Sequence, residues 1–297
     1  MEKLPIIPLS ACRDGSSRPV DPRASRPIGI FDSGLGGLTV AREIARKLPH
    51  EDFIYFGDSA RCPYGPRDPQ EVREFVLEIC RFLVEQDVKL IVIACNTATA
   101  AGLELAQQTF KLPPIMGVIK PGAHAAVQAT HSRRIAVIGT KGTIDSAEYT
   151  TAIKQLDAGA YVKGIATPEL ADIVEAGPDE SKGEYTHITG QSVQELIEQY
   201  LHPLAAAKID VLVLGCTHYP VLAEPIQAVV GDDVTLISSA EEVALEVYET
   251  LKSREHLNLN NDTPKYEFYT TGEVDSFRRC GTHIFGSDFE NLTKIEL

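Results

Sequence analysis

Two short stretches of the chain share one sequence pattern, and this pattern constrains the fold more than any other feature. Leu90-Ile-Val-Ile-Ala-Cys-Asn-Thr97 and Val211-Leu-Val-Leu-Gly-Cys-Thr-His218 each run from four apolar, mostly β-branched residues through a small residue to a cysteine and polar side chains. Such a run is typical of a parallel strand that is buried on both faces. Ligands of open α/β sheets bind beyond the carboxyl ends of the strands, so the pattern places Cys95 and Cys216 where chemistry occurs in this architecture.

The composition predicts two compact globular units. The chain has 297 residues, of which 43% are hydrophobic and 24% charged. These values fit a folded protein that is larger than one typical domain. The formal net charge of −14 argues against nucleic acid or an anionic membrane as the main partner, because both repel an acidic surface.

The beginning of the chain carries no targeting pattern. Residues 1–26 mix Pro, Ser and Arg, and we expect them to form a flexible N-terminal extension. Their one apolar patch, Leu4–Leu9, is interrupted by two prolines and is too short for a signal-peptide core or a membrane span. We therefore expect a cytoplasmic protein whose six cysteines are reduced. Four of them have no paired spacing, and we interpret these as structural: Cys12, Cys62, Cys80 and Cys280.

A glycine-rich loop follows the first predicted strand. Ile28–Phe31 leads into Asp32-Ser-Gly-Leu-Gly-Gly37 and then into a helical stretch, Leu38–Leu48. A strand, glycine loop and helix in this order can bind an anion at the helix N-terminus. The spacing lacks the final glycine of a dinucleotide fingerprint, and no acidic residue stands where a ribose would need it, so we discount NAD. A carboxylate would repel an anion at this loop. We therefore expect Asp32 to meet an ammonium group or to orient a catalytic partner.

The same order of a strand followed by a glycine-containing loop recurs in the second half of the chain. Arg134–Ile138 is another predicted strand, followed by the Gly- and Thr-containing loop Gly139–Asp145, and the Cys216 strand comes later. We infer an α/β fold of two pseudo-symmetric domains with mostly parallel sheets, which face one another across an interdomain cleft that holds the active site. The pattern of Tyr266–Thr270 predicts one more strand near the end of the chain. We therefore expect the chain to return to the first domain. The expected domains are residues 27–119 plus 238–297, and residues 120–237.

The sequence allows several alternative roles for the two thiols. A disulfide between Cys95 and Cys216 is disfavoured in a reducing compartment, and neither lies in a C-x-x-C pair. A zinc site from Cys95, Cys216 and His218 lacks the second ligand pair of a closed structural site. Inert core cysteines are the plainest alternative. However, both thiols are followed by hydrogen-bonding side chains, which a core position seldom tolerates without a ligand.

Two thiols also suit proton transfer at a carbon atom. If the sulfur atoms lie on opposite faces of one substrate carbon, a thiolate removes the proton from one face while a thiol delivers another proton to the other face. Each sulfur carries one proton, so the reaction inverts the stereocentre and the roles exchange in the reverse direction. A pair of pseudo-symmetric domains suits such a reaction because enantiomers make nearly mirror-image demands on a site.

Several motifs of the chain together resemble a known family, the glutamate racemases among the cofactor-independent amino-acid racemases. The motifs that carry the resemblance are Gly29–Thr39, Tyr55–Arg61, Pro63–Gly65, Ala94–Ala98, Gly117–Val118 with Pro121, Ile138–Thr143, Leu214–Pro220 and Phe268–Thr271. The resemblance implies interconversion of L- and D-glutamate without pyridoxal phosphate, other cofactors or a metal. It also implies a supply of D-glutamate for peptidoglycan, and hence for cell wall biogenesis and cell shape, by a homodimer.

The resemblance also implies roles for particular residues. Cys95 and Cys216 would be the two acid/base residues, assisted by Asp32 and His218, respectively. The implied substrate contacts are Asp32, Ser33, Tyr64, Gly65, Asn96, Thr97, Thr217 and His218, with Glu175 and Thr143 in a supporting shell. Two alternatives stay open at this point: an aspartate racemase of the same superfamily, and a catalytically silent amino-acid-binding regulator.

Overall fold

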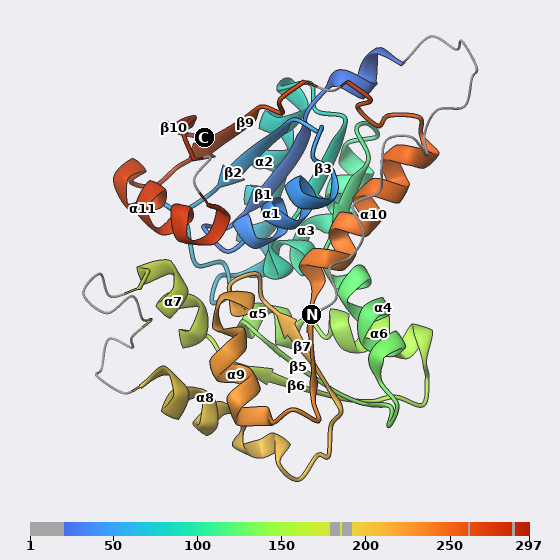
Figure 1. Ribbon diagram of the computed structural model, residues 1–297, viewed down its shortest axis with the longest axis vertical. Helices are drawn as coiled ribbons and strands as arrows, with labels where there is room; N and C mark the ends of the chain where they lie inside the picture. Colours follow the sequence, from blue (N-terminus) through green and yellow to red (C-terminus); the bar gives the residue numbers. More distant parts are fainter. Residues whose placement is uncertain (1–20, 179–184, 186–191, 261, 287–288) are drawn as a thin grey trace.

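The fold consists of two parallel sheets flanked by helices (Figure 1). The computed structural model describes residues 21–178, 185, 192–260, 262–286 and 289–297. The first sheet has the order β10-β9-β2-β1-β3-β4 and the second the order β6-β5-β7-β8, and all these neighbours pair in parallel. This architecture confirms the predicted fold class. The strands are β1 (Ile28–Asp32), β2 (Phe53–Gly57), β3 (Leu90–Ile93), β4 (Ile115–Gly117), β5 (Arg134–Gly139), β6 (Tyr161–Ala166), β7 (Val211–Gly215), β8 (Thr235–Ser238), β9 (Tyr266–Thr270) and β10 (Leu292–Lys294).

The two sheets repeat one strand order. The run β2-β1-β3-β4 of the first sheet matches β6-β5-β7-β8 of the second in sequence order and direction. Strands β3 and β7 therefore occupy equivalent places, and they are the strands that precede Cys95 and Cys216. Strands β9 and β10 extend the first sheet beyond β2, so the chain does return to its first half.

Helices cover both faces of each sheet. In the first half, α1, α10 and α11 pack on one face and α2 and α3 on the other, whereas in the second half α4 and α6 lie opposite α7, α8 and α9. The helices are α1 (Leu38–Lys47), α2 (Pro69–Glu85), α3 (Asn96–Thr109), α4 (Ile119–Ala129), α5 (Lys141–Asp145), α6 (Glu148–Leu156), α7 (Glu169–Ala176), α8 (Val193–Leu201), α9 (Ala223–Val230), α10 (Ser239–Ser253) and α11 (Val274–Phe285), with 3₁₀ turns η2 (Pro22–Ser25), η3 (His202–Leu204) and η4 (Tyr219–Leu222).

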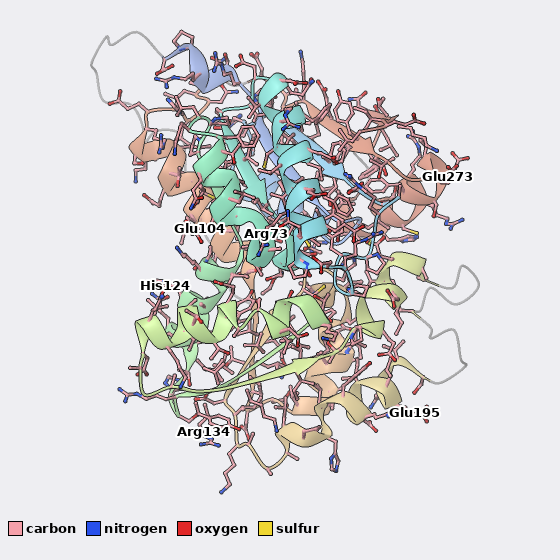
Figure 2. The ribbon with its side chains drawn as sticks, turned by 180° about the vertical axis from the view of Figure 1, so that it is seen from behind. Arg73, Glu104, His124, Arg134, Glu195 and Glu273 are labelled. Carbon is pink, nitrogen blue, oxygen red and sulfur yellow. The ribbon has the colours of Figure 1, made fainter. Side chains whose placement is uncertain are left out.

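Strand residues alternate between these two layers, as the period of a strand requires. Ile30 and Val92 belong to the apolar cluster on the α1 side, whereas their neighbours Phe31 and Ile93 belong to the cluster under α2 and α3. On the outer surface, Arg73 of α2 donates from Nε to the Ala101 carbonyl of α3 at 2.9 Å and ties these two helices together (Figure 2).

The two halves share part of their core. The apolar cluster on the α1 side continues from strands of the first sheet into β7, α7, α8 and α9 of the second half. Helix α10 packs against α1 and α4 and so contacts both halves. The division at residues 119/120 and 237/238 stays a prediction; with those bounds, Ser238, the last residue of β8, would fall in the first domain.

The end of the expected extension is ordered against the first half. Asp21 caps η2, Ala24 is buried, and the Ala24 carbonyl accepts a hydrogen bond from Lys89 Nζ at 2.6 Å. Residues 1–20, with Cys12 and the Leu4–Leu9 patch, lie outside the described residues. Among the residues that are described, no helix combines the length and the apolar character needed to cross a membrane.

Candidate active site

A small cavity lies where the carboxyl ends of the two sheets meet. It measures about 20 Å³ for water-sized spheres, which is room for about one water molecule. Most of the predicted site residues line it: Ser33, Tyr64, Gly65, Cys95, Asn96, Thr97, Thr143, Glu175, Cys216, Thr217 and His218. The cavity wall therefore combines residues that are far apart in the sequence and come from both halves.

Cys95 follows β3 and caps the N-terminus of α3. Its sulfur accepts a hydrogen bond from the Ala98 N–H at 3.4 Å and donates to Ser33 Oγ at 3.8 Å. Burial raises the pKa of the Cys95 thiol to about 12, and the nearby Asp32 charge acts in the same direction, although the Ala98 N–H opposes both. In this closed arrangement Cys95 is therefore a thiol at neutral pH, which makes it a proton donor.

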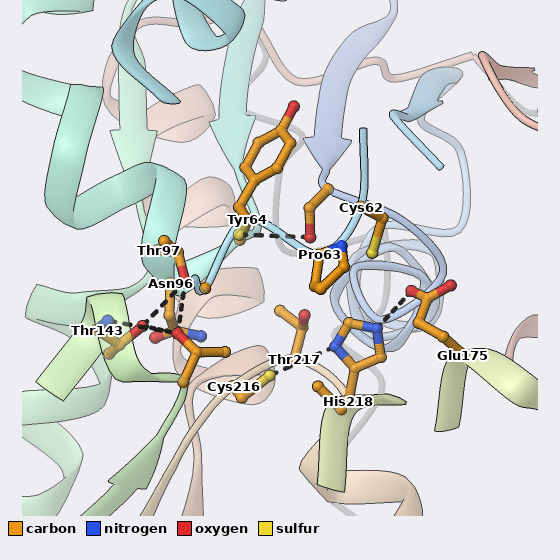
Figure 3. Close-up of a pocket in the computed structure, with 15 residues that line it drawn as sticks. Cys62, Pro63, Tyr64, Asn96, Thr97, Thr143, Glu175, Cys216, Thr217 and His218 are labelled. Carbon is orange, nitrogen blue, oxygen red and sulfur yellow. Dashed lines mark hydrogen bonds and ion pairs between the residues drawn. The ribbon is translucent and has the colours of Figure 1, made fainter. Parts of the chain in front are cut away.

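Cys216 follows β7 and lies beside a histidine and a carboxylate. Its sulfur is 3.4 Å from Nδ1 of His218, and Nε2 of His218 is 2.5 Å from Oε1 of Glu175 on α7 (Figure 3). The Leu35 N–H donates to the same carboxylate oxygen at 2.7 Å. The four residues therefore form a chain of contacts that runs from the thiol to the loop before α1.

The His218–Glu175 pair is charged at neutral pH. Burial acts to lower the pKa of His218, but the neighbouring Cys216 and Glu175 outweigh it, so the pKa lies well above its ordinary value of 6.5. Burial acts to raise the pKa of Glu175, but the hydrogen bond and charge of His218 bring the pKa below its ordinary value of 4.5. The protonated imidazole places a positive charge 3.4 Å from the Cys216 sulfur.

Asp32 lies behind the cavity wall and does not line it. It is fully buried at the end of β1, where Oδ2 accepts from the Gly34 N–H at 3.1 Å and Oδ1 accepts from Thr217 Oγ1 at 3.2 Å. Burial raises the pKa of Asp32, an effect that the His218 charge partly offsets. The structure therefore joins Asp32 to the cavity-lining residues through Thr217.

A group of hydroxyl and amide side chains joins the two halves on the other side of the cavity. Thr97 Oγ1 of α3 is 2.7 Å from Thr140 Oγ1 and 3.2 Å from Thr143 Oγ1 of the second half. Asn96 Oδ1 accepts from Tyr149 OH of α6 at 2.8 Å, while its buried Nδ2 has no hydrogen-bond partner among the described residues. These groups can donate to the carboxylates of a bound amino acid.

Tyr64 lines the cavity, but its ring points away from Cys216 and Thr217 (Figure 3). Its hydroxyl donates to the buried Asp58 carboxylate. The next residue, Gly65, has no side chain, and so the cavity wall at this position is formed largely by backbone.

Residues that the sequence did not single out as site residues also line the cavity: Cys62, Pro63, Thr140 and Ala171. The Cys62 thiol lies close enough to Glu175 to help lower the pKa of that carboxyl, and it therefore lies beside the chain of contacts that leads to Cys216. We interpreted Cys62 as structural because it lacks paired spacing. Its place in the turn-rich segment after β2 was a usable signal, because ligand contacts concentrate in such loops.

The chain is similar to known proteins over most of its length. A family model described as Asp/Glu/hydantoin racemase matches residues 28–247. The chain belongs to this racemase family. Within the family it is 42% identical to the glutamate racemase of Bacillus cereus, covering 93% of this chain and 98% of that protein. It is 47% identical to the glutamate racemase of Exiguobacterium sibiricum, covering 87% and 92%, respectively.

Solved structures of the racemase family share the whole fold. The crystal structure of glutamate racemase isoform RacE1 from Bacillus anthracis matches with a TM-score of 0.83 at 43% identity, over 92% of this chain and 98% of that one. The Francisella tularensis glutamate racemase, solved in complex with D-glutamate, matches with a TM-score of 0.83 at 32% identity over the same shares. The resemblance to glutamate racemases read from the sequence is confirmed.

Proposed function

We propose that the protein is a glutamate racemase that interconverts L- and D-glutamate by a two-base mechanism without pyridoxal phosphate. The observation that carries this proposal is the pair of thiols: Cys95 and Cys216 follow equivalent strands of two matching sheets, and both line one cavity. The family membership supports the amino-acid racemase activity, and the curated glutamate racemases among its relatives favour glutamate over aspartate.

The charges around the two sulfur atoms suggest how the reaction starts. The Cys216 thiolate, beside the protonated His218, removes the proton from Cα of one enantiomer. The Cys95 thiol then delivers its own proton to the opposite face of the same carbon. The product leaves a thiol at Cys216 and a thiolate at Cys95, and this is the state that accepts the other enantiomer. Water returns the two sulfur atoms to the starting state.

The remaining residues bind and orient the substrate in this proposal. Hydroxyl and amide donors bind its carboxylates: Ser33, Asn96, Thr97 and Thr143. The Thr217 hydroxyl donates its proton to Asp32, so it accepts a hydrogen bond from the substrate ammonium group. His218 assists Cys216, and Glu175 holds the imidazole in its charged form. Asp32 assists on the Cys95 side and orients Thr217. No step of this scheme needs a cofactor, because thiols alone accept and donate the proton.

The biological setting is part of the proposal. The D-glutamate product supplies peptidoglycan synthesis, which is the role of this family, and thereby cell wall biogenesis and cell shape. We further propose that the enzyme works in the cytoplasm as a homodimer. Sedimentation equilibrium of the full chain tests the dimer, and a monomer at micromolar concentration would contradict it.

Deuterium oxide distinguishes two bases from one. Early in the reaction of L-glutamate, the D-glutamate formed should carry deuterium at Cα, because the delivering thiol has exchanged with solvent, while the remaining L-glutamate keeps its protium. Chiral chromatography with mass detection measures both pools. Deuterium that enters the L-glutamate pool as fast as D-glutamate forms would rule out the two-base mechanism.

Serine variants test the two thiols separately. Cys95→Ser and Cys216→Ser should each lower racemisation by about 10²- to 10⁴-fold, the usual contribution of a positioned acid or base. The matched control is Cys80→Ala, which removes a buried thiol from α2 outside the cavity and should leave the rate unchanged. Glutamate that stabilises the protein against heat without any racemisation would instead favour a silent binding protein.

A further inference from the structure

A buried carboxylate gathers three donors just outside the cavity. Asp58 follows β2 and is fully buried. Its Oδ2 accepts from the Tyr64 hydroxyl and from Arg61 Nε at 2.6 Å, and its Oδ1 accepts from Thr271 Oγ1 at 2.8 Å. A buried carboxylate is tolerated only where donors of this kind satisfy it, and hydrogen bonds to a charged group are the stronger ones.

The donors around Asp58 are themselves fixed. The Arg61 guanidinium lies 4.0 Å from the centre of the Phe75 ring, and its Nη1 bonds to Glu78 at 2.6 Å. Thr271 directly follows β9, and its Oγ1 also accepts from the Ala60 N–H at 3.0 Å. The Asp58 carboxylate is thus held by helix α2, by the end of β9 and by its own loop.

Tyr64 connects this cluster to the cavity. Its side chain is 1% exposed, its ring centre is 5.4 Å from that of Phe75, and its hydroxyl is used by Asp58. The next carbonyl, that of Gly65, accepts from the Gly142 N–H of the second half at 3.0 Å. The segment Cys62–Gly65 is therefore anchored on one side by Tyr64 and reaches the other half of the molecule on its far side.

We propose that Asp58 is a positioning residue for the racemase reaction: by anchoring the Tyr64 hydroxyl, it fixes the backbone of Tyr64 and Gly65 that faces the substrate. This inference rests on the proposed function. In this arrangement the Tyr64 side chain is an anchor that points away from the substrate. Arg61 and Thr271 hold the Asp58 carboxylate in the one orientation in which it can receive the Tyr64 hydroxyl.

The proposal predicts a particular kinetic signature. A backbone wall that binds the substrate contributes equally to the ground state and the transition state. Loosening it should raise KM for both enantiomers and leave kcat nearly unchanged. A Tyr64 hydroxyl that acted on the reacting carbon would instead lower kcat when removed. The two roles are therefore separable by steady-state kinetics.

The main variant is Tyr64→Phe, which keeps the ring and removes the anchoring hydroxyl. We expect KM for L- and D-glutamate to rise roughly tenfold with kcat changed less than about threefold, since only uniform binding is lost. Thr271→Val should act in the same direction, and Thr271→Ser, which keeps the hydroxyl, should restore wild-type KM. The matched control is Tyr269→Phe, which removes a hydroxyl–carboxylate bond of 3.1 Å to Glu267 outside the cavity.

Further measurements separate anchoring from folding and from the proposed function. Asp58→Asn should raise KM as Tyr64→Phe does, and the double variant should be no worse than the more affected single variant, because both remove one connection. If Asp58→Asn fails to fold, the KM values of Tyr64→Phe, Thr271→Val and Thr271→Ser still test the inference. An unchanged KM in Tyr64→Phe, or a fall in kcat alone, overturns the inference.

A wild-type protein without racemase activity would overturn the proposed function, and the anchoring role would then be decided by binding. Calorimetric titration of glutamate into wild type and Tyr64→Phe should give a roughly tenfold weaker Kd for the variant, the same loss of uniform binding. Equal Kd values, or no binding by the wild type, would overturn the anchoring role as well.

Discussion

Cys95 and Cys216 hold equivalent places in the fold but differ in their surroundings. Cys95 lies at a helix N-terminus near Asp32, whereas Cys216 contacts the protonated His218. The thiolate is the reactive form of cysteine. The two sulfur atoms of a nearly symmetric site are therefore chemically distinct, although the proposed two-base reaction uses both of them in both protonation states.

Alkylation by iodoacetamide should show this asymmetry. At pH 7 we expect Cys216 to react first, while the Cys95 rate rises about tenfold per pH unit toward its pKa, because only the thiolate reacts. That pKa is about 12. Peptide mapping by mass spectrometry measures each site, and Cys80, buried in α2, reports any global unfolding. Faster labelling of Cys95 at pH 7 would contradict the expected order of reactivity.

The His218–Glu175 pair should make stability depend on pH in a defined window. The lowered pKa of Glu175 contributes stability above its ordinary value of 4.5, which is lost as pH falls through the folded value. The raised pKa of His218 contributes stability below its ordinary value of 6.5, which is lost as pH rises through the folded value. The pair is therefore most stabilising between these two ordinary values.

Glu175→Gln tests this window. Removing one partner of a largely buried pair should lower the free energy of unfolding by about 3 kcal/mol between pH 4.5 and 6.5, with a smaller loss at higher and lower pH. Urea unfolding at several pH values measures the difference between variant and wild type. A difference that stays constant with pH would mean that the pair is not charged in the folded protein.

At the scale of elements, the loop between β1 and α1 joins the two halves of the site. A Cβ atom on Gly36 would lie 2.5 Å from His218 Nδ1 and 2.5 Å from Thr217 Oγ1. This close approach explains why the loop needs glycine there: the first half packs directly on the residues that follow Cys216. The loop therefore positions His218 without containing a catalytic group at that point.

Gly36→Ala should consequently damage catalysis more than stability. A displacement of His218 by about 1 Å can lower kcat by roughly 100-fold. The matched control is Gly159→Ala, whose added Cβ would find its nearest side-chain atoms at 3.4 Å, an ordinary contact. Kinetic assays with thermal melts of both variants make the comparison, and a wild-type kcat in Gly36→Ala would contradict the packing argument.

The elements that the sequence predicts well are those with clear periodicity. The bounds expected for the late strand Tyr266–Thr270 are those of β9. The predicted loop Gly139–Asp145 was wrong, because Thr140 caps a short helix by accepting from the Thr143 N–H at 3.3 Å. Strand β10 was missed because three residues, paired only with β9, carry almost no pattern.

The sequence likewise predicts the candidate site only in part. Helix α3 begins at Asn96 because Cys95 caps it, and cysteine is not among the usual capping residues, so the sequence carries no clear signal for this helix start. The strand pattern nevertheless located both thiols at equivalent sheet positions. The direction of the Tyr64 ring and the place of Cys62 depend on the path of an irregular loop. That path follows from the contact of Tyr64 with Asp58 and from the contact of Asp58 with Thr271, which is distant along the chain.

At the scale of the whole molecule, the cavity is too small for the proposed substrate. Glutamate has ten non-hydrogen atoms, whereas about 20 Å³ accommodates about one water molecule. Hydrogen bonds between Thr97 and Thr140 and between Gly142 and Gly65 close the cavity across the two halves. We infer that these contacts open when glutamate binds or leaves and re-form around it, with α10 connecting the halves throughout.

Hydrogen exchange at Gly142 measures this opening directly, because its N–H bonds to Gly65 O across the halves at 3.0 Å. A ligand that binds only the closed state at 100 times its Kd should slow exchange at Gly142 by about 100-fold. The Val213 amide, buried within β7, is the matched control: it should change little, because its protection comes from the sheet itself. Equal exchange at Gly142 with and without glutamate would mean that the halves do not separate and that substrate reaches the two thiols by another route.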